Sequence, residues 1–326
     1  MKLNLYDESL NRIAIIDNNY ISCLWSEGYN TVESFVVELQ NTDEFRKKVR
    51  PNCYFGRTDR KTLMVVKTVE IAGNTIQATG KQASRVLDDV VYIGEILTGS
   101  DIPSSIKSAY ESTEKYPSFE IPQSSVMVNS GIEKSNDTIL GFCKDLCQNA
   151  DLGFRVVRNN GKIELQFYKP EEKTNLVFSE KYGNVSIESI NLSVEAYKNY
   201  AIVLGEGEGT DRTRVDVDIS NGNQKYVLFV DADNIKQETG EYISEYKERL
   251  RSKGIEELQK QNQTWNCSFE PFTKGFGVDY DLGDIVTVLL NDYNLKFSTR
   301  ITKVSQKSQN NQVKTTITVG ELTIKR

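Results

Sequence analysis

Two cysteines, Cys143 and Cys147, have the spacing that would start a metal site, because residues four apart lie on one face of a helix. Structural zinc, however, takes four nitrogen or sulfur ligands. The 326 residues include no histidine, and the other cysteines are distant in the sequence. The lack of histidine also removes Ser-His-Asp and Cys-His catalytic groups. The pair is interpreted as two buried thiols, and no metal or cofactor is expected.

Residues 205–211 form a glycine-rich segment in which glycine alternates with glutamate before Thr210 and Asp211. Phosphate-binding loops present backbone N–H groups at the start of a helix and usually use a lysine. This segment has no lysine, and no helix is predicted directly after it. We interpret it as a flexible acidic turn between two strands.

Two Asp-x-Asp pairs, Asp216 with Asp218 and Asp231 with Asp233, are candidates for a divalent cation site. Neither continues into the twelve-residue loop that calcium-binding hands use. Alternation along a strand places each pair on one solvated face. A glycosidase would need a carboxylate pair, but nothing marks out one pair among the 46 Asp and Glu residues. We therefore expect no catalytic, cofactor-binding or metal-binding residues and no enzyme activity.

The charge of the chain argues against specific nucleic-acid binding. Its formal net charge is −6, and it contains no dense run of Lys and Arg. The basic segment 57–61 looks like a hairpin tip and is predicted to be a solvated turn. No stretch approaches the ~20 apolar residues that span a bilayer, and the first residues lack an apolar signal segment. These features predict synthesis in the cytosol, reduced thiols and no membrane insertion.

The elements that would position these residues are mostly strands. Residues 63–71 and 75–80 predict a hairpin around an Ala-Gly-Asn turn, followed by a short helix or irregular edge over 81–87. Short runs rich in β-branched and aromatic residues predict further strands. They cover residues 11–16, 20–26, 34–39, 185–192, 200–204, 213–219, 225–230, 264–269, 284–289, 296–303 and 314–322.

Two helices are predicted with different surroundings. The first is capped by residues 135–137 and stops at Gly153, and a hairpin with an Asn-Gly turn follows over 154–168. The second, longer helix covers 241–262. Its apolar stripe is expected to face a core and consists of Tyr242, Tyr246, Leu250, Ile255 and Leu258.

The order of these elements predicts an α+β, mainly β, fold of three domains. A first β-domain covers 1–93, and an inserted α+β domain covers 94–178, where 94–122 reads as a linker with one short helix. A second β-domain covers 179–326 and carries the long helix 241–262.

Two segments together resemble a known family. Residues 20–29 run from Tyr-Ile-Ser-Cys-Leu-Trp to Gly-Tyr and lead into 34–39, and residues 279–284 read Asp-Tyr-Asp-Leu-Gly-Asp before an apolar strand. This pattern resembles the Gp37-like siphovirus tail proteins, which are related to baseplate hub proteins of contractile phages and of phage-derived bacteriocins (tailocins). The order of elements agrees over nearly the whole chain.

The resemblance implies two tube-forming antiparallel β-barrel domains and a structural baseplate hub. Three copies would form a pseudo-hexameric ring between tail tube and central spike. The implied partners are further copies of the chain, a tail tube or distal tail protein, a spike protein and a tape measure protein, and the implied location is the tail tip of a virion or tail-like particle. A tail-tip cell-wall hydrolase and a glycan- or receptor-binding module remain as alternatives.

The second motif also has a physical interpretation. Leu282 is expected to pack inward, and Gly283 is expected to permit a tight turn before the strand. Asp281 and Asp284 are short acidic residues that would accept hydrogen bonds from exposed backbone N–H groups. The motif is therefore predicted to be structural.

Overall fold

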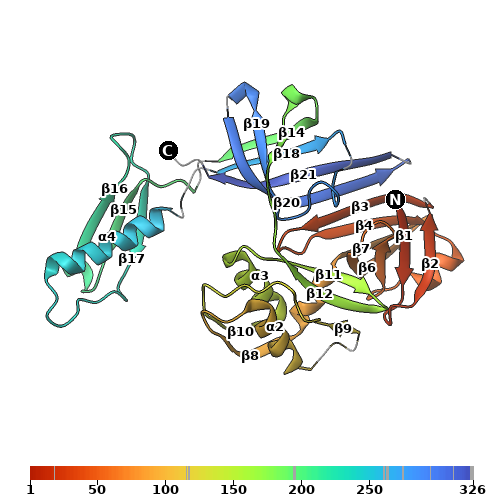
Figure 1. Cartoon of the computed structure of the whole chain (residues 1–326), viewed down its shortest axis with the longest axis horizontal. Helices are drawn as coiled ribbons and strands as arrows, with labels where there is room; N and C mark the ends of the chain where they lie inside the picture. Colours follow the sequence, from red (N-terminus) through yellow and green to blue (C-terminus); the bar gives the residue numbers. More distant parts are fainter. Residues whose placement is uncertain are drawn as a thin grey trace. The chain divides into compact units, whose positions relative to one another are not determined.

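The computed structural model describes residues 1–17, 19–114, 116, 118–193, 196–259, 261, 264–273, 275–293, 295–310 and 312–323. The chain divides into two compact units (Figure 1). Unit 1 comprises Met1–Glu188 and Ser268–Gly320, and unit 2 comprises Ser189–Cys267 and Glu321–Arg326. The finer division into domains 1–93, 94–178 and 179–326 stays a prediction.

Thirteen of the described strands form one large sheet. Its order is β14–β18–β21–β20–β3–β4–β7–β6–β5–β1–β2, and β19 pairs with both β13 and β20. The strands are β1 (Lys2–Tyr6), β2 (Arg12–Asp17), β3 (Tyr20–Gly28), β4 (Ser34–Gln40), β5 (Tyr54–Arg57), β6 (Leu63–Ala72), β7 (Thr75–Gln82), β13 (Glu172–Phe178), β14 (Val185–Ser193), β18 (Thr264–Pro271), β19 (Ile285–Leu290), β20 (Leu295–Gln309) and β21 (Gln312–Thr323).

Alternating burial explains why the first strands pack on a common core. On β4, Phe35, Val37 and Leu39 are fully buried, whereas their neighbours in the sequence are not. The rings of Trp25 and Phe55 lie 6.1 and 5.7 Å from the ring of Phe35, measured between centroids. The mainly β fold and the predicted hairpin of β6 and β7 are confirmed.

The strand pairing differs in two respects from closed, purely antiparallel barrels. Among the described residues, no pairing joins β2 to β14, so closure of the large sheet into a barrel is not observed. The pairing is also not purely antiparallel. Parallel pairs join β13 to β19, β12 (Lys162–Tyr168) to β9 (Phe119–Glu120), and β15 (Tyr200–Leu204) to β17 (Val227–Asp231).

The segment between β7 and β13 packs around a second core of unit 1. Its elements are the 3₁₀ helix η1 (Ala83–Asp89), β8 (Val91–Ile96), α2 (Ile102–Glu111), β10 (Lys134–Thr138), α3 (Ile139–Asn149), β11 (Gly153–Asn159) and β12. The helices α2 and α3 are each buried on one face. The short helix α1 (Asp43–Lys48) lies earlier in the chain, between β4 and β5. The predicted hairpin of β11 and β12 is confirmed.

The one short helix expected within 94–122 is α2, whose first turn is capped by the Asp101 carboxylate at 3.1 Å from the Ser104 nitrogen. The helix is packed on the core, so the interpretation of the stretch as a linker was wrong. The predicted ends of the next helix, α3, were also wrong. The side chain that caps α3 belongs to Thr138, because residues 134–138 pair as β10. The left-handed residue after α3 is Asp151, with φ +53°, rather than Gly153.

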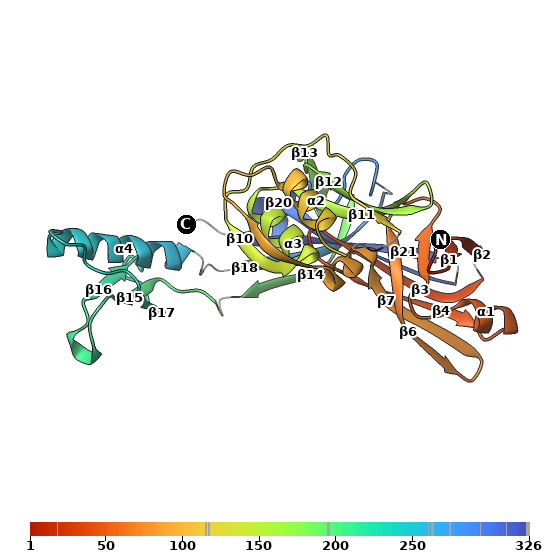
Figure 2. The same ribbon diagram turned by 90° about the horizontal axis from the view of Figure 1, so that it is seen from below.

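Unit 2 is a three-stranded sheet, β16 (Arg214–Asp218)–β15–β17, covered by α4 (Ile243–Gln259) (Figure 2). Tyr246, Leu250 and Leu258 are buried against the sheet, as predicted. Tyr242 and Ile255 are 74% and 38% exposed, so they were wrongly included in the buried stripe. The buried face instead continues through Gly254, where a Cβ atom would lie 2.7 Å from Val203.

No helix within the described ranges is long and apolar enough to cross a membrane.

Candidate functional site: a buried ion-pair junction

Arg60 lies in the turn between β5 and β6, and its side chain is only 13% exposed. Its Nη2 atom lies 3.1 Å from a carboxylate oxygen of Glu27 on β3 and 3.4 Å from one of Asp281, shortly before β19. The guanidinium carbon lies 4.0 Å from the ring centroid of Phe276. We use the name junction for the group of five residues Arg60, Glu27, Asp281, Phe276 and Arg155.

Glu27 is the most deeply buried member of the junction, with 1% of its side chain exposed. Its other carboxylate oxygen accepts a hydrogen bond of 3.1 Å from the indole N–H of Trp25. Burial alone would lower the pKa of Arg60, but the carboxylates of Glu27 and Asp281 outweigh it and raise this pKa. Each buried charge is therefore compensated by its partner.

Arg155 of β11 connects the segment between β7 and β13 to the same place. Its Nη1 atom lies 3.5 Å from the second carboxylate oxygen of Asp281, and its guanidinium carbon lies 5.0 Å from the Tyr168 ring centroid. The Tyr168 hydroxyl donates to the backbone carbonyl of Leu282 at 3.2 Å. The junction thus joins β3, the β5–β6 turn, β11 and the segment before β19.

The turn that carries Arg60 is the hairpin tip predicted for 57–61, but only Thr58, Asp59 and Lys61 are solvated. Arg57 is buried, and its Nε donates to Asp59 at 2.9 Å while Nη1 donates to Gln306 of β20. The Arg57 guanidinium also lies 5.9 Å from the Trp25 ring. Both arginines are drawn out of solvent because Gln306, Glu27 and Asp281, which are distant in the sequence, supply partners for them.

The capping roles of Asp284 and Asp281 are confirmed. The Asp284 carboxylate accepts from the backbone N–H of Asp281 and of Glu171, both at 2.9 Å, and pairs with Lys173 at 3.0 Å. Asp281 accepts from the backbone N–H of Leu282 at 2.9 Å. Leu282 is buried, as expected.

Two glycines allow this segment to approach its neighbours closely. Gly277 has φ +82°, and a Cβ atom there would lie 2.4 Å from Nη1 of Arg60. Gly283 has φ +89°, and a Cβ atom there would lie 2.5 Å from the Tyr29 ring. Both positions combine a left-handed backbone with a steric limit, so other residues would be strained there.

The other candidates lie apart from the junction. Cys143 and Cys147 are fully buried in α3, and burial raises the pKa of both thiols. The acidic pairs lie on the solvated face of unit 2, where each of three aspartates pairs with a cation rather than with another carboxylate. These pairs are Asp216 with Arg214, Asp218 with Lys225, and Asp231 with Arg212. Within the described ranges, no three His, Cys, Asp or Glu residues are grouped as metal ligands.

The glycine-rich segment 205–211 is held by protein groups. Arg212 donates to the backbone carbonyls of Leu204 and Gly205 at 2.8 and 2.7 Å, and the Tyr246 hydroxyl accepts from the Glu206 N–H at 2.7 Å. Only a three-residue 3₁₀ helix, η3 (Gly209–Asp211), lies in it. This geometry agrees with an acidic turn.

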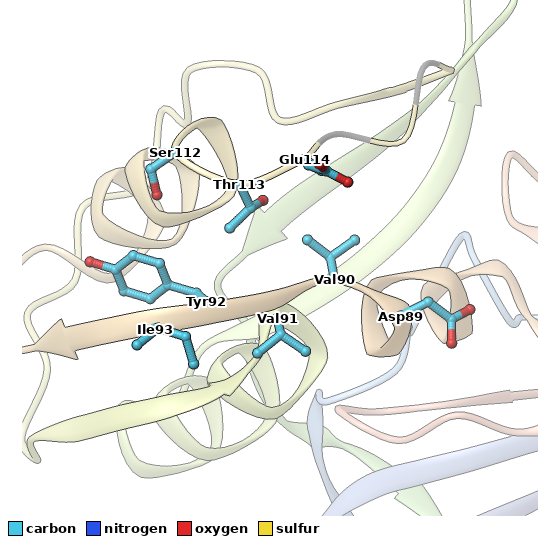
Figure 3. A pocket seen from close by; sticks show the side chains of 8 residues that line it. All are labelled: Asp89, Val90, Val91, Tyr92, Ile93, Ser112, Thr113 and Glu114. Atoms are coloured by element: carbon cyan, nitrogen blue, oxygen red, sulfur yellow. The ribbon is translucent and has the colours of Figure 1, made fainter.

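A groove of about 720 Å³ lies between β8 and the end of α2 in unit 1 (Figure 3). Residues 89–93 and 112–114 line it. No pattern in the sequence pointed to this groove, because 94–122 was interpreted as a linker.

The junction was also missed at the level of sequence. Arg60 is separated from Glu27 by 33 residues and from Asp281 by 221 residues. No short motif spans such distances. The available signal was Asp281 and Asp284 of the 279–284 motif, of which Asp281 faces two arginines.

Solved structures of phage tail proteins share this fold. The prophage tail protein gp18 from Listeria monocytogenes EGD-e is 13% identical, with a TM-score of 0.56, and the match covers 98% of this chain and 94% of that chain. The 43 kDa tail protein of prophage MuSo2 from Shewanella oneidensis is 11% identical, with a TM-score of 0.61 and 98% coverage of each chain. A chain of the phage P2 baseplate in its activated conformation with Ca is 10% identical, with a TM-score of 0.52 and 98% coverage of each chain.

At these identities the likeness concerns the fold alone. No curated protein matches the sequence. A family model does match, and it covers residues 2–321, which is almost the whole chain. The chain therefore belongs to the family of Siphovirus ReqiPepy6 Gp37-like proteins.

Proposed function

We propose that the chain is the structural baseplate hub of a phage-type tail, in a phage or a tailocin. The observation that carries this proposal is the family match over residues 2–321, together with a fold shared along the whole chain with tail and baseplate proteins. The coarser conclusion, a structural protein of the phage tail or baseplate type, rests directly on this match.

The geometry of the junction supports a structural role. Its charged groups pair with one another, Glu27 also accepts from the Trp25 N–H, and the aromatic ring of Phe276 covers Arg60. A buried ion pair of this kind fixes the mutual position of the segments that carry it. A hub has to hold its shape under load, and paired charges serve that purpose better than reactive ones.

The finer features of the proposal concern assembly. Three copies would form a pseudo-hexameric ring that joins the tail tube to the central spike. Its contacts would be with further copies, with a tail tube or distal tail protein, with a spike protein and with a tape measure protein. The chain would then be located in the tail-tip baseplate after synthesis in the bacterial cytoplasm.

The test is to locate the chain in intact particles. A tagged chain is expressed in the producing strain, tail-like particles are purified, and the tag is located by gold labelling in electron micrographs. We expect label at the tail tip, with about three copies per particle as in a cyclic trimer. A control tag on a major tube protein should label the shaft.

Two outcomes would contradict the proposal that the chain is a baseplate hub. Label along the shaft would indicate a tube protein, and particles without label would remove the chain from the assembly. In that second case, a glycan- or receptor-binding module is the next candidate. It has one observation in its favour, since Tyr182 and Phe272 are both 61% exposed on segments joined by a hydrogen bond from the Phe272 N–H to the Asn184 carbonyl.

A further inference from the structure

Strand β17 lies at one edge of the three-stranded sheet of unit 2. Among the described residues it pairs with β15 alone, in parallel and with an unbroken register. The Tyr200 N–H donates to the Tyr226 carbonyl at 3.2 Å, and the Ala232 N–H donates to the Leu204 carbonyl at 2.8 Å. These two hydrogen bonds fix which backbone groups of β17 face β15.

The outward groups of β17 follow from the alternation of backbone groups between the two edges of a strand. The even-numbered residues from 226 to 232 bond to β15, so the N–H and C=O groups of Val227, Phe229 and Asp231 point to the other edge. No strand within the described ranges pairs with this edge. Unpaired groups in such a row form a template for a further strand.

The face of this sheet that points away from α4 carries large apolar and aromatic side chains (Figure 2). Ala201, Val203 and Val230 lie in the core with α4, so the side chains next to them in the strands point to the other face. These are Tyr200, Ile202 and Leu204, which are half-buried, and Val227 and Phe229, which are 47% and 60% exposed.

We call these five residues the outer stripe. It is continuous, because Tyr200 is the direct partner of Val227 and Ile202 is the direct partner of Phe229. A contiguous exposed apolar patch is typical of a protein–protein contact. The edge of β17 therefore offers free backbone groups and apolar side chains on the same residues.

The charge is one-sided at the end of the sheet where β15 and β17 stop. The segments that follow these two strands carry four carboxylates without a cation partner among the described residues, namely Glu206, Glu208, Asp211 and Asp233. Arg212 and Arg214 are already paired with Asp231 and Asp216. Lys236 is the one unpaired cation of residues 204–240, all of which are described. The electrostatic complement of this end is a positively charged segment.

We propose that the open edge of β17 binds an extended segment of a partner protein, which adds to the sheet as a fourth strand. Main-chain hydrogen bonds to Val227, Phe229 and Asp231 supply affinity, and alternate apolar side chains of the segment widen the outer stripe. Lys or Arg residues at one end of the segment meet the unpaired carboxylates and supply specificity. The proposal does not depend on the hub, because binding to an isolated chain tests it and the location in particles tests the hub.

The experiment uses fluorescein-labelled peptides without terminal charges, in which valine alternates with threonine. Because the edge accepts a strand in either direction, a pair of lysines is placed at the N-terminal end of one peptide and at the C-terminal end of another, and matched peptides carry glutamates. Fluorescence anisotropy with the full chain should show one lysine peptide binding at least about tenfold tighter than its glutamate counterpart. In that complex, hydrogen exchange of the Val227 and Phe229 amides should slow.

Three results would overturn the proposal. Neither lysine peptide binds, or lysine and glutamate peptides bind equally, or exchange at these two amides does not change. Light scattering and hydrogen exchange of the chain without peptide provide the remaining comparison. A dimer in which the Val227 and Phe229 amides are already protected would assign the edge to a second copy of the chain and not to a partner protein.

Variants test the position of the site. Val227→Pro removes an outward N–H at the first residue of an edge strand, where proline is tolerated, and should weaken binding of the lysine peptide about tenfold or more. Glu208→Lys combined with Asp233→Lys should have an effect of the same size. The matched control, Glu8→Lys with Glu70→Lys, makes the same change in net charge at exposed positions of unit 1. If Val227→Pro disturbs folding, the two charge variants decide. An equal loss of binding in both would mean a general charge effect and no site at β17.

Discussion

At the scale of single residues, Arg60 is the position at which a substitution would remove the cation that pairs with a buried carboxylate. Replacing it with methionine would leave Glu27, which is 1% exposed, with the Trp25 N–H as its remaining side-chain partner among the described residues. Removing one partner of a buried ion pair destabilises a protein by about 3–5 kcal/mol. We expect Arg60→Met to lower the free energy of unfolding by about this amount, measured by urea denaturation at constant m-value.

The control for Arg60 is an exposed pair in the same unit. Arg46 and Asp43 lie 3.4 Å apart with side chains 51% and 86% exposed, so Arg46→Met should change stability by less than about 1 kcal/mol. Adding Glu27→Gln to Arg60→Met should recover part of the loss, because no buried charge is then left unpaired. Equal effects of Arg60→Met and Arg46→Met would mean that the junction does not stabilise the fold.

At the scale of elements, Gly254 decides how closely α4 packs on its sheet. Alanine is the better helix former by about 1 kcal/mol. In this helix, however, its Cβ would lie 2.7 Å from Val203 and 2.8 Å from Val217. Overpacking a core usually costs about 1–3 kcal/mol. We therefore expect Gly254→Ala to destabilise unit 2, which thermal denaturation followed by helical circular dichroism can measure.

The matched change for Gly254 is Ser252→Ala on the exposed face of α4, where only helix propensity acts. It should stabilise the helix by about 0.5 kcal/mol or less. A stabilising Gly254→Ala would contradict the packing seen here and would mean that the helix stands further from β15 and β16.

Elements with a local signal were predictable from the sequence, whereas elements that depend on distant partners were not. The Asn-Gly turn identified the β11–β12 hairpin, and Gly73 identified the turn of β6 and β7. One short helix was expected within 94–122, but Ser and Pro made this stretch look like a linker, although Ile102, Ile106 and Tyr110 of α2 have the spacing of a packed helix. The junction had no comparable signal, since its partners meet only in the folded sheet.

At the scale of the whole molecule, the two units have separate cores. The core around Trp25 and Phe35 lies in unit 1, and the core around Tyr246 and Leu250 lies in unit 2. A unit with its own core is expected to fold without the rest of the chain. The family match and the shared fold cover both units. Whether unit 2 contributes to the folding of unit 1, or only to assembly, can be tested by removing unit 2.

Deleting residues 189–267 answers this question. A short Gly-Ser turn would then join Glu188 to Ser268, in strands β14 and β18, which are neighbours in the sheet. The sequence contains two tryptophans, Trp25 and Trp265, so the deletion leaves buried Trp25 as the single fluorescent reporter. We expect one cooperative urea transition with a red shift of the Trp25 emission. An aggregated product, or emission already shifted in native buffer, would show that unit 1 needs unit 2 in order to fold.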